Sequence, residues 1–590
     1  MNINNIIAIL ASFLLFIQCT EKEESSEKSS SASVVKSKKI FHYARSAEPR
    51  SLDPAIQFDQ ISSIFTSSIY DTLLEYHYLK RPYELIPSLL QDFPKVSADG
   101  TLYEFQLRQG IFFHDDPCFQ QGKGREVTAD DVIFSLKRFS DAKINVRSWF
   151  LLDNTIEGLD EFRKKTSSKT FTVAEIIKEK IAGLKKIDRF HFSVKLKKKN
   201  PLFLYSIASS SAGIVPHEAI TKYGSEFGRH PVGTGPFKLE KYLKKQTMVL
   251  VKNDKYHGIY PQLGGNEPAL LLDKGKRLPF LDEVHVHYIP ESQPQMLKFK
   301  KGGLSWIGLD RDNFIKMAYK NPDGSFSLKK EEAKKYDIYS ESALSAAYYY
   351  FNLKDPLFKD NWNLRAALVH SLDINAKIEL LRNGRGTKLY SVVPIGIQGS
   401  EEQIGKKWYD YDLKKAKEYL TKAGYPGGKG LPELELTLAA SSSQYKKDYE
   451  FLRNSFAKIG VILKADYKTW STHTKALERG DFHIATWGWA ADYPDAENFL
   501  QLFYGGNIPG SNLSYFANKE FDTLYEEIRY MSHGAQRTAK IAKMGEIVKS
   551  QIPAIIDYTP VMSGLIQKNV KNFKRNIMIT HPFKYLDIRD

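Results

Sequence analysis

Apolar positions in the N-terminal third of the chain first follow a helical period. After Thr128, the apolar residues Val132, Leu136 and Phe139 recur at helical spacing. Asp131 stands three residues after Thr128, as in a capping box that closes the first turn of a helix. These positions predict a helix that begins after Thr128 and buries one face.

The C-terminal half alternates the two periodicities. Asp412 is placed to cap a helix that ends at Gly424. Residues 434–438 then alternate apolar and polar side chains, which is typical of a half-buried strand. A further helix ends at Gly460 and is followed by an apolar strand pattern over 461–467. Helices and strands that alternate in this way predict α/β layers.

The N-terminus carries an apolar segment that is too short to span a bilayer. Ile6–Ile17 is a 12-residue run, whereas a spanning helix needs about 20 residues. The following Gln18-Cys19 resembles the processing site of bacterial lipoproteins, so we expect a signal peptide over 1–18 and a lipidated Cys19. An ordinary secreted protein cut near this point remains the alternative, because Gln18 replaces a small residue and no Lys or Arg precedes the run.

The segment after Cys19 is polar. Residues 20–39 are rich in Ser, Glu and Lys and contain too little apolar surface to fold, so we expect a flexible tether over 19–39. No later apolar run approaches the length of a spanning helix, which predicts a body outside the cytoplasmic membrane. If Cys19 is lipidated, Cys118 has no disulfide partner and is expected to be a free, buried thiol.

Composition excludes several protein classes. With 42% hydrophobic and 13% aromatic residues, the chain can build large cores and is not disordered in bulk. Two cysteines in 590 residues exclude a disulfide framework. The net charge is +16, but the lysine clusters at 197–199 and 244–245 are short and no nucleic-acid-binding signature accompanies them. We therefore expect no nucleic-acid partner.

Catalytic motifs along the chain are incomplete. His217-Glu218 begins like a zinc-protease motif, but Thr221 replaces the second histidine. Residues 424–429 fall short of a phosphate-binding loop, and no G-x-S-x-G turn is present. His285 and His287 could form half of a metal site, although a solvated strand face more often carries such residues. We expect no catalytic residue, no metal and no cofactor.

A series of motifs connects the chain to a known family. In order, the motifs are Ala47–Pro54, Tyr70–Leu73, Leu107–Asp115, Thr128–Val132, Pro231–Phe237, Tyr349–Asn352, Arg365–Leu368, Leu413–Gly424 and Trp487–Asp495. Together they resemble the extracellular solute-binding proteins of peptide and nickel ABC importers, which include the oligopeptide- and dipeptide-binding proteins. The series extends over about residues 40–590, and an insertion at Asp116–Glu126 replaces a short turn of the family pattern.

The resemblance implies a domain organisation. It predicts an α/β, two-lobed periplasmic-binding-protein fold, with a hinge that lets the lobes close on a ligand and an extra subdomain inserted in the first lobe. The first lobe would comprise 40–340 plus 558–590, with the inserted subdomain at about 85–190. The second lobe would comprise 341–557.

The resemblance also implies ligand-binding residues. In the oligopeptide- and dipeptide-binding members, the Asp of the Trp-x-x-Asp motif pairs with the α-amine of the peptide; by motif this is Asp492, with Trp489 as an apolar wall. Trp470, Trp487 and Tyr350 complete the expected ligand-binding set. Structural roles remain open: Asp492 could be a cap or turn residue, and the tryptophans could be core residues.

Two departures from the family pattern concern the ligand. Thr486 stands where the oligopeptide-binding pattern has an arginine, and Tyr350 stands where an acidic residue is expected. We expect that the pocket reads a peptide's C-terminal carboxylate differently, or that the ligand is not an ordinary oligopeptide. The family also contains nickel-chelate, haem and sugar binders, so the resemblance defines the role more closely than the ligand.

These inferences predict a lipid-anchored, extracytoplasmic receptor. It would capture peptides or a peptide-like solute between its lobes and deliver them to the permease and ATPase complex of an ABC importer. We expect a monomer that performs no chemistry. Two alternatives from other classes are a secreted hydrolase with an unrecognised site, and a surface adhesin or chaperone that kept the fold.

Overall fold

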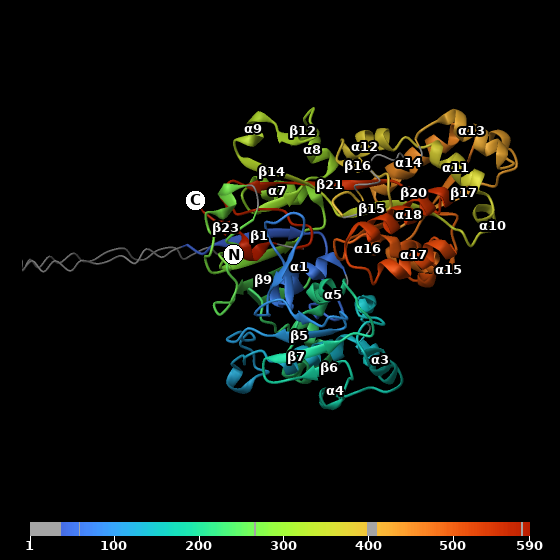
Figure 1. The fold of residues 1–590 in the computed structure, drawn as a ribbon. Helices are drawn as coiled ribbons and strands as arrows, with labels where there is room; N and C mark the ends of the chain where they lie inside the picture. The colour runs from blue at the N-terminus through green and yellow to red at the C-terminus, as the bar shows by residue number, and fades with distance from the viewer. Residues whose placement is uncertain are drawn as a thin grey trace, which may run out of the picture. The chain divides into compact units, whose positions relative to one another are not determined.

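A computed structural model describes the chain over residues 37–57, 59–144, 146–264, 267–397, 400, 410–579 and 582–589. Residues 39–590 form one compact unit of mixed helices and sheets (Figure 1). The predicted signal peptide 1–18 and Cys19 lie outside the described residues, as does most of the 19–39 tether. Within the described residues, no helix has both the length and the apolar character needed to cross a membrane.

A mixed eight-stranded sheet forms the centre of the first lobe. Its strands are β1 (Ile40–Arg45), β8 (Phe237–Leu243), β9 (Thr247–Lys252), β10 (Glu283–Tyr288), β11 (Trp306–Gly308), β14 (Tyr336–Ser342), β16 (Gly386–Lys388) and β21 (Tyr558–Gln567). The order is β14-β21-β11-β1-β10-β9-β8, and β16 also pairs with β21. β1 runs parallel to β10 and β11, whereas β9, β14 and β21 form antiparallel pairs.

The alternation in β10 explains where its histidines lie. Val284 and Val286 are fully buried in the core on one side of the sheet. His285 and His287 point to the other side, where the Nδ1 atom of His42 in β1 lies 3.2 Å from the Nε2 atom of His287. Among the described residues, no group of three His, Cys, Asp or Glu side chains is placed to hold a metal ion.

A smaller sheet extends the first lobe. The strands β4 (Lys95–Val96), β5 (Leu102–Gln106), β6 (Leu184–Lys186) and β7 (His191–Lys195) pair in the order β4-β5-β7-β6. The helices that accompany it are α2 (Ala129–Phe139), α3 (Leu159–Ser168) and α4 (Val173–Lys178). Thr128 precedes α2 as predicted, and its backbone N–H donates to the Asp131 carboxylate at 2.9 Å. The predicted apolar face of α2 is buried.

One expectation for this lobe needs correction. Cys118 is a free cysteine, but it is half-buried rather than buried. It lies in the inserted segment Asp116–Glu126 and packs against the core from outside. The packing explains the difference, because the residue contributes to the edge of the core instead of its interior.

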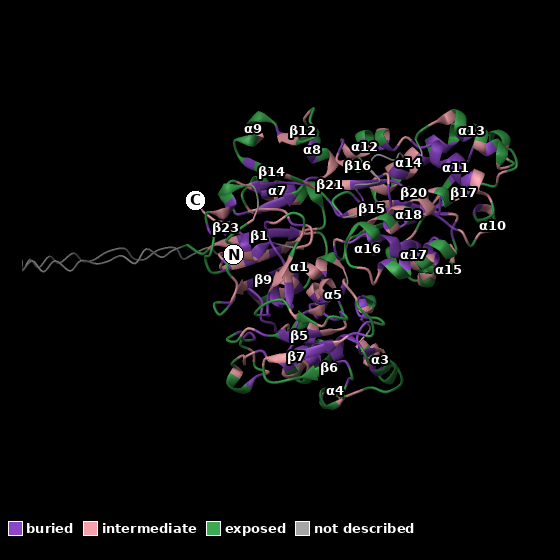
Figure 2. Ribbon diagram, in the orientation of Figure 1, coloured by how far each residue is buried: buried purple, intermediate pink, exposed green. Residues whose placement is uncertain are grey.

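A five-stranded sheet forms the centre of the second lobe. Its strands are β15 (Ser345–Phe351), β17 (Leu434–Leu438), β18 (Leu463–Tyr467), β19 (Ile484–Ala490) and β20 (Ala554–Ile556), in the order β18-β17-β19-β15-β20. Its surrounding helices are α11 (Trp362–His370), α13 (Leu413–Lys422), α14 (Ser443–Ala457), α16 (Glu497–Leu500), α17 (Lys519–Ile528) and α18 (Ala535–Gln551). Two separate apolar cores contain these helices, α11, α13 and α14 in one and α16, α17 and α18 in the other. The sheet is accordingly buried between them (Figure 2).

The periodicities read from the second lobe are confirmed. The Asp412 carboxylate accepts the backbone N–H groups of Lys414 and Lys415 at 3.0 Å each, which caps α13. Gly424 follows that helix with a φ of 94°, a left-handed conformation that glycine adopts readily. The predicted strand over 434–438 is β17, and the strand predicted over 461–467 is β18.

Shorter elements connect these layers. The remaining helices are α1 (Gln60–Ile69), α5 (Phe203–Ala208), α6 (His217–Tyr223), α7 (Ser292–Lys300), α8 (Arg311–Met317), α9 (Lys330–Ala333), α10 (Pro356–Lys359), α12 (Ile374–Arg382) and α15 (Trp470–Arg479). The remaining strands are β2 (Leu74–Tyr76), β3 (Leu85–Pro87), β12 (Ala318–Lys320), β13 (Phe326–Leu328), β22 (Val570–Lys571) and β23 (Asp587–Ile588).

The two large sheets are joined by very short connections. Only Ala343 and Leu344 separate β14 from β15, and only Asp557 separates β20 from β21. Asp557 is buried there and forms an ion pair with the buried Lys377 of α12. The Lys377 ammonium also donates to the Tyr349 hydroxyl at 2.6 Å. The exact lobe limits of 340/341 and 557/558, and the 85–190 limits of the subdomain, stay predictions.

Candidate ligand-binding site

A cavity of about 730 Å³ has walls from both lobes. The first lobe contributes the end of β1, one face of α1 and the segment Ile577–Ile579. The second lobe contributes Ser345 and the residues Ala490–Asp492 at the end of β19. Its volume lies within the range of about 300–1,000 Å³ that is typical of small-molecule pockets.

Hydroxyl groups dominate one wall of the cavity. The α1 residues Ser63, Ser67 and Ser68 line it, and the hydroxyl of Ser68 donates back to the helix at the Ile64 carbonyl, at 2.8 Å. The Gln57 amide donates to the hydroxyls of Ser210 and Ser211 at 3.1 and 2.9 Å. This wall offers polar but uncharged groups. The Asp59 side chain, which accepts the Ser62 N–H at 2.9 Å, sets the start of α1.

An aromatic cluster forms the adjoining wall. Tyr43 of β1 and Trp306 of β11 stack with ring centroids 5.5 Å apart. The Trp306 indole donates to the Tyr339 hydroxyl at 3.0 Å. Arg45, two residues after Tyr43 on the same strand, donates to the Tyr43 hydroxyl at 3.0 Å. The pairing of β1 with β11, through Tyr43 and Trp306, places these rings side by side.

Acidic groups of the first-lobe wall have internal partners. The Asp71 carboxylate accepts a hydrogen bond from the Thr234 hydroxyl at 2.8 Å and lies 3.2 Å from the His257 imidazole. Burial alone would raise the pKa of Asp71, but the contacts with His257 and Thr234 hold it below its usual value. Glu75 pairs with Lys584 at 2.5 Å. Both carboxylates therefore have partners within the protein, and for Glu75 that partner is a cation.

Asp492 is the acidic residue of the second-lobe wall. Asn498 donates to its carboxylate at 2.9 Å and accepts its backbone N–H at 3.0 Å. Among the described residues, no Lys, Arg or His forms an ion pair with Asp492. Its side chain is accessible through the cavity, while protein surrounds it elsewhere; this desolvation raises the pKa of Asp492 to about 6.

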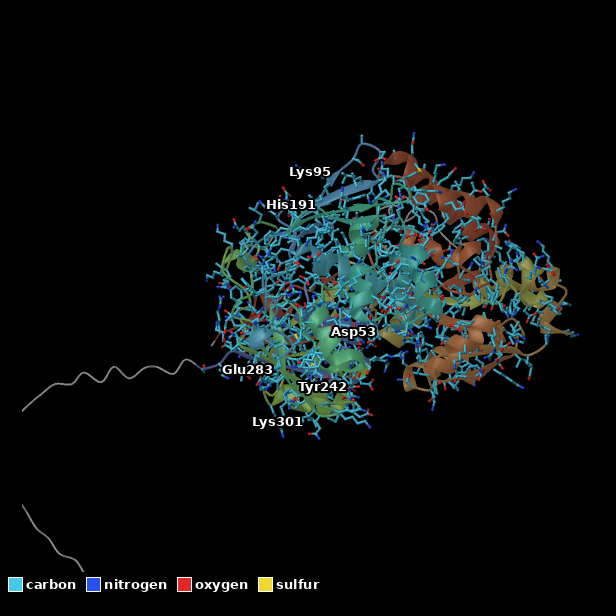
Figure 3. All side chains as sticks on the ribbon, turned by 90° about the horizontal axis from the view of Figure 1, so that it is seen from below. Asp53, Lys95, His191, Tyr242, Glu283 and Lys301 are labelled. Atoms are coloured by element: carbon cyan, nitrogen blue, oxygen red, sulfur yellow. The ribbon has the colours of Figure 1, made fainter. Side chains whose placement is uncertain are left out.

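Two buried carboxylates of the described chain are each paired with an arginine. Asp53, labelled in Figure 3, is 2% exposed and pairs with both terminal nitrogens of Arg138, at 2.8 and 2.5 Å. Asp495, three residues after Asp492, pairs in the same way with Arg537, at 2.9 and 2.7 Å. Asp492 is therefore unusual in facing a cavity with only an amide partner.

The other expected ligand-binding residues lie in the second lobe, and one of them, Trp489, is connected to Asp492. The Trp489 indole donates to Asn498 at 3.0 Å, so Asn498 links it to Asp492. Trp487 stacks on Trp470 with centroids 5.5 Å apart and on Tyr350 at 6.5 Å. Tyr350 is fully buried, whereas Trp470 is 54% exposed.

The cavity brings together only part of the expected set. Of the five expected residues, Asp492 lines the cavity and the four aromatic residues do not belong to the described lining. Their contact with a ligand stays a prediction. Sequence reasoning missed Arg45 and Asn498. Arg45 lies two residues before the Ala47–Pro54 motif, which could have drawn attention to it, but no sequence signal indicated Asn498.

Glu218 of the incomplete zinc-protease motif has a structural partner among the described residues. Glu218, next to His217 at the start of α6, pairs with Arg125 at 2.6 Å. Arg125 also pairs with the buried Asp131 at 2.6 Å. The Glu218 carboxylate therefore anchors α6 to the start of α2.

Comparison with known proteins supports the resemblance seen in the motifs. The family model for bacterial extracellular solute-binding proteins, family 5, matches residues 84–511. Heme-binding protein A of Haemophilus influenzae is 27% identical over 98% of this chain and 96% of its own length. The dipeptide-binding protein of Escherichia coli is 25% identical over 93% of this chain and 95% of its own length.

Solved structures show the same fold. The periplasmic binding protein DppA of Helicobacter pylori, in complex with the peptide STSA, superposes with a TM-score of 0.73 at 25% identity, covering 93% of this chain and 98% of that one. A dipeptide-binding protein of Pseudoalteromonas in complex with Met-Leu gives 0.72 at 21% identity, covering 91% and 97%. The predicted two-lobed α/β fold is confirmed. The chain belongs to the family 5 extracellular solute-binding proteins, the binding components of peptide-type ABC importers.

Proposed function

We propose that this protein captures short peptides with a free α-amine in the cavity between its lobes. The observation that carries the proposal is Asp492, a carboxylate that faces the cavity and, among the described residues, has only the Asn498 side chain as its hydrogen-bond partner. A peptide ammonium group would supply the missing cation through a charge-assisted hydrogen bond. Peptide-bound relatives of the same fold support this ligand class.

Binding would act through a population shift. A peptide that touches Asp492 in the second lobe and the wall of the first lobe stabilises the closed arrangement of the lobes. The permease and ATPase of an ABC importer would then recognise the closed form. The protein performs no chemistry in this scheme, so a peptide should be released intact.

The test combines a variant with a modified ligand. Native mass spectrometry after incubation with a mixture of defined di- to tetrapeptides, including Met-Leu and Ser-Thr-Ser-Ala, first shows whether intact peptides bind. Calorimetry then compares each bound peptide with its N-acetyl form, in the wild type and in Asp492→Asn. Loss of one partner of such a pair costs about 2–5 kcal/mol, or roughly 30- to 5,000-fold in affinity.

Coupling between the two changes identifies the contact. We expect acetylation to matter in the wild type and to have little further effect in Asp492→Asn. Asp360→Asn is the control, because Asp360 is an exposed aspartate of the second lobe. Additive losses would show that Asp492 does not hold the amine. Cleaved peptides would favour a hydrolase, and preferential binding of haemin would favour the ligand named for the Haemophilus relative.

A second part of the proposal concerns membrane attachment. We propose that Cys19 is lipidated and that residues 19–39 tether the body to the membrane. Cys19→Ala should then move the protein from the membrane to the soluble extracytoplasmic fraction, because stable anchoring depends on the acyl chains. Mass spectrometry of the mature N-terminus checks the modification. An unmodified Cys19, or membrane retention of Cys19→Ala, would contradict the anchor.

A further inference from the structure

Several charged side chains line the cavity, and most have an internal partner. Glu75 is paired with Lys584 at 2.5 Å. Asp71 lies 3.2 Å from His257. Glu75 and Lys584 therefore neutralise each other, and Asp71 has polar partners within the protein. Among the described residues, the charged side chains that line the cavity are Arg45, Asp71, Glu75, Asp492, Arg575 and Lys584.

Two charges of opposite sign are left for a ligand. Arg575 interacts electrostatically with Glu341, which lies outside the cavity lining. Arg45 forms no ion pair with a carboxylate among the described residues. Asp492 likewise has no cationic partner in that part of the chain. Arg45 belongs to the first lobe and Asp492 to the second, so the two charges come from different lobes.

The contacts of Arg45 leave its guanidinium available to an anion. One terminal nitrogen donates to the Tyr43 hydroxyl at 3.0 Å, and the group lies 5.8 Å from the centre of the Tyr43 ring. Its Nε atom is buried and has no acceptor among the described residues. Arg45 lines the cavity, so the remaining N–H groups of its guanidinium are the donors that a ligand can reach. The planar fork of a guanidinium suits the two oxygens of a carboxylate.

We propose that Arg45 binds the C-terminal carboxylate of the captured peptide. This inference rests on the proposed function, in which Asp492 holds the α-amine. Thr486 replaces the arginine of the oligopeptide-binding pattern in the second lobe, and Arg45 supplies a guanidinium from the first lobe instead. The ligand is then a peptide with both termini free, whose opposite charges join the two lobes.

The test compares peptides with free and amidated C-termini. Calorimetry measures the affinity of Ser-Thr-Ser-Ala and Met-Leu, each as free acid and as C-terminal amide, for the wild type. We expect the amides to bind about 30-fold more weakly or worse, as when one partner of an enclosed charge pair is removed. In Arg45→Gln the affinity for the free-acid peptides should fall by a similar factor. The ratio between the affinities for the acid and the amide of one peptide should then approach one.

Two further variants test whether the charge and the planar shape of the Arg45 side chain matter, as opposed to the loss of any positive charge from the protein. Arg45→Lys keeps the charge but loses the planar fork, so its affinity for the free acids should lie between those of the wild type and Arg45→Gln. Arg453→Gln removes the same charge from an exposed site on α14 and should leave both affinities unchanged. Thermal melting shows whether each variant is folded, and the comparison within the wild type needs no variant.

The outcomes distinguish this inference from the proposed function. Equal affinity of the wild type for acids and amides would overturn the role of Arg45, as would an unchanged ratio in Arg45→Gln. If acetylation still acts through Asp492 in those cases, only the present inference fails. If neither these two peptides nor any peptide of the defined mixture binds the wild type, the proposed function fails and the carboxylate site falls with it.

Discussion

The connection between the lobes and the wall of the cavity each contain an aspartate, buried in the first case and exposed to the cavity in the second, with opposite results. Asp557, between β20 and β21, is 2% exposed and pairs with Lys377, which is 1% exposed. Asp492, after β19, faces the cavity with only Asn498 as partner. The protein neutralises the charge that holds its fold together and leaves unpaired the charge that a ligand can reach.

The pKa values express the same contrast. Desolvation raises the pKa of both Asp557 and Asp492, but at Asp557 the Lys377 ammonium opposes the rise. The Asp557 carboxylate in turn raises the pKa of Lys377 above its usual value, although burial alone would lower it. No cation opposes the desolvation of Asp492, so the pKa of that carboxyl is raised. Lys377 thus stabilises the ionised form of Asp557, whereas only a ligand could supply a cation to Asp492.

The largest effect is expected at the connection between the lobes. Lys377→Met leaves Asp557 buried without a counter-charge, which should lower the free energy of unfolding by about 3–5 kcal/mol. Chemical denaturation followed by circular dichroism measures the change. Lys446→Met, on the exposed side of α14, is the control and should have little effect. If the two variants are equally stable, Asp557 and Lys377 do not form the structural pair described here.

Asp492→Asn should have the opposite effect on stability in the ligand-free protein. A carboxyl whose pKa is higher in the folded state than in the unfolded state stabilises the fold below its unfolded pKa, and this contribution is lost as pH rises through about 6. At pH 7 the variant should therefore melt at the same temperature as the wild type or higher, even though it binds peptides less well. A fall in melting temperature comparable to that of Lys377→Met would indicate a structural role.

The pH dependence of binding gives a smaller effect of known sign. Only the ionised Asp492 pairs with a peptide ammonium group, so affinity should be full above about pH 6. Below that value the dissociation constant should rise by up to about tenfold per pH unit. Calorimetry between pH 4.5 and 7.5 tests this, and the slope should be much reduced in Asp492→Asn. A profile that is identical in both proteins would exclude Asp492 as the titrating group.

The smallest expected change is in overall dimensions. Ligand should reduce the radius of gyration through closure of the lobes while helix content stays nearly constant. Small-angle scattering with and without a confirmed peptide measures this, and circular dichroism provides the control. The Lys377–Asp557 pair should be kept in both states, because it lies at the connection itself. Identical scattering curves would show that the lobes do not move.

Local sequence signals predicted the elements well. The capping residues Thr128 and Asp412 and the alternation over 434–438 depend on neighbours a few positions away, and each appears in the structure as expected. The family motif identified Asp492, and the structure places that residue at the cavity. These features are short-range or carried by a motif, so a single sequence suffices to find them.

Long-range partners were beyond the reach of the same reasoning. Lys377 and Asp557 lie 180 positions apart. Arg45 and Asp492 come from opposite ends of the chain, and only folding brings them to one cavity. Asn498 lies six positions after Asp492, in α16, and the irregular residues between them mean that no helical or strand period connects the two. Charge pairs of this kind depend on the complete packing of both lobes.

The position of β21 in the large sheet has a consequence for the order of events during synthesis. β21 lies between β14 and β11, yet it consists of residues 558–567, near the end of the chain. The ribosome completes β14 at residue 342 and must add more than 200 residues before β21 exists, which takes about 10–45 s at about 5–20 residues per second. The first lobe therefore cannot close its sheet until β21 has been synthesised, and β14 waits for its neighbour while the whole second lobe is made.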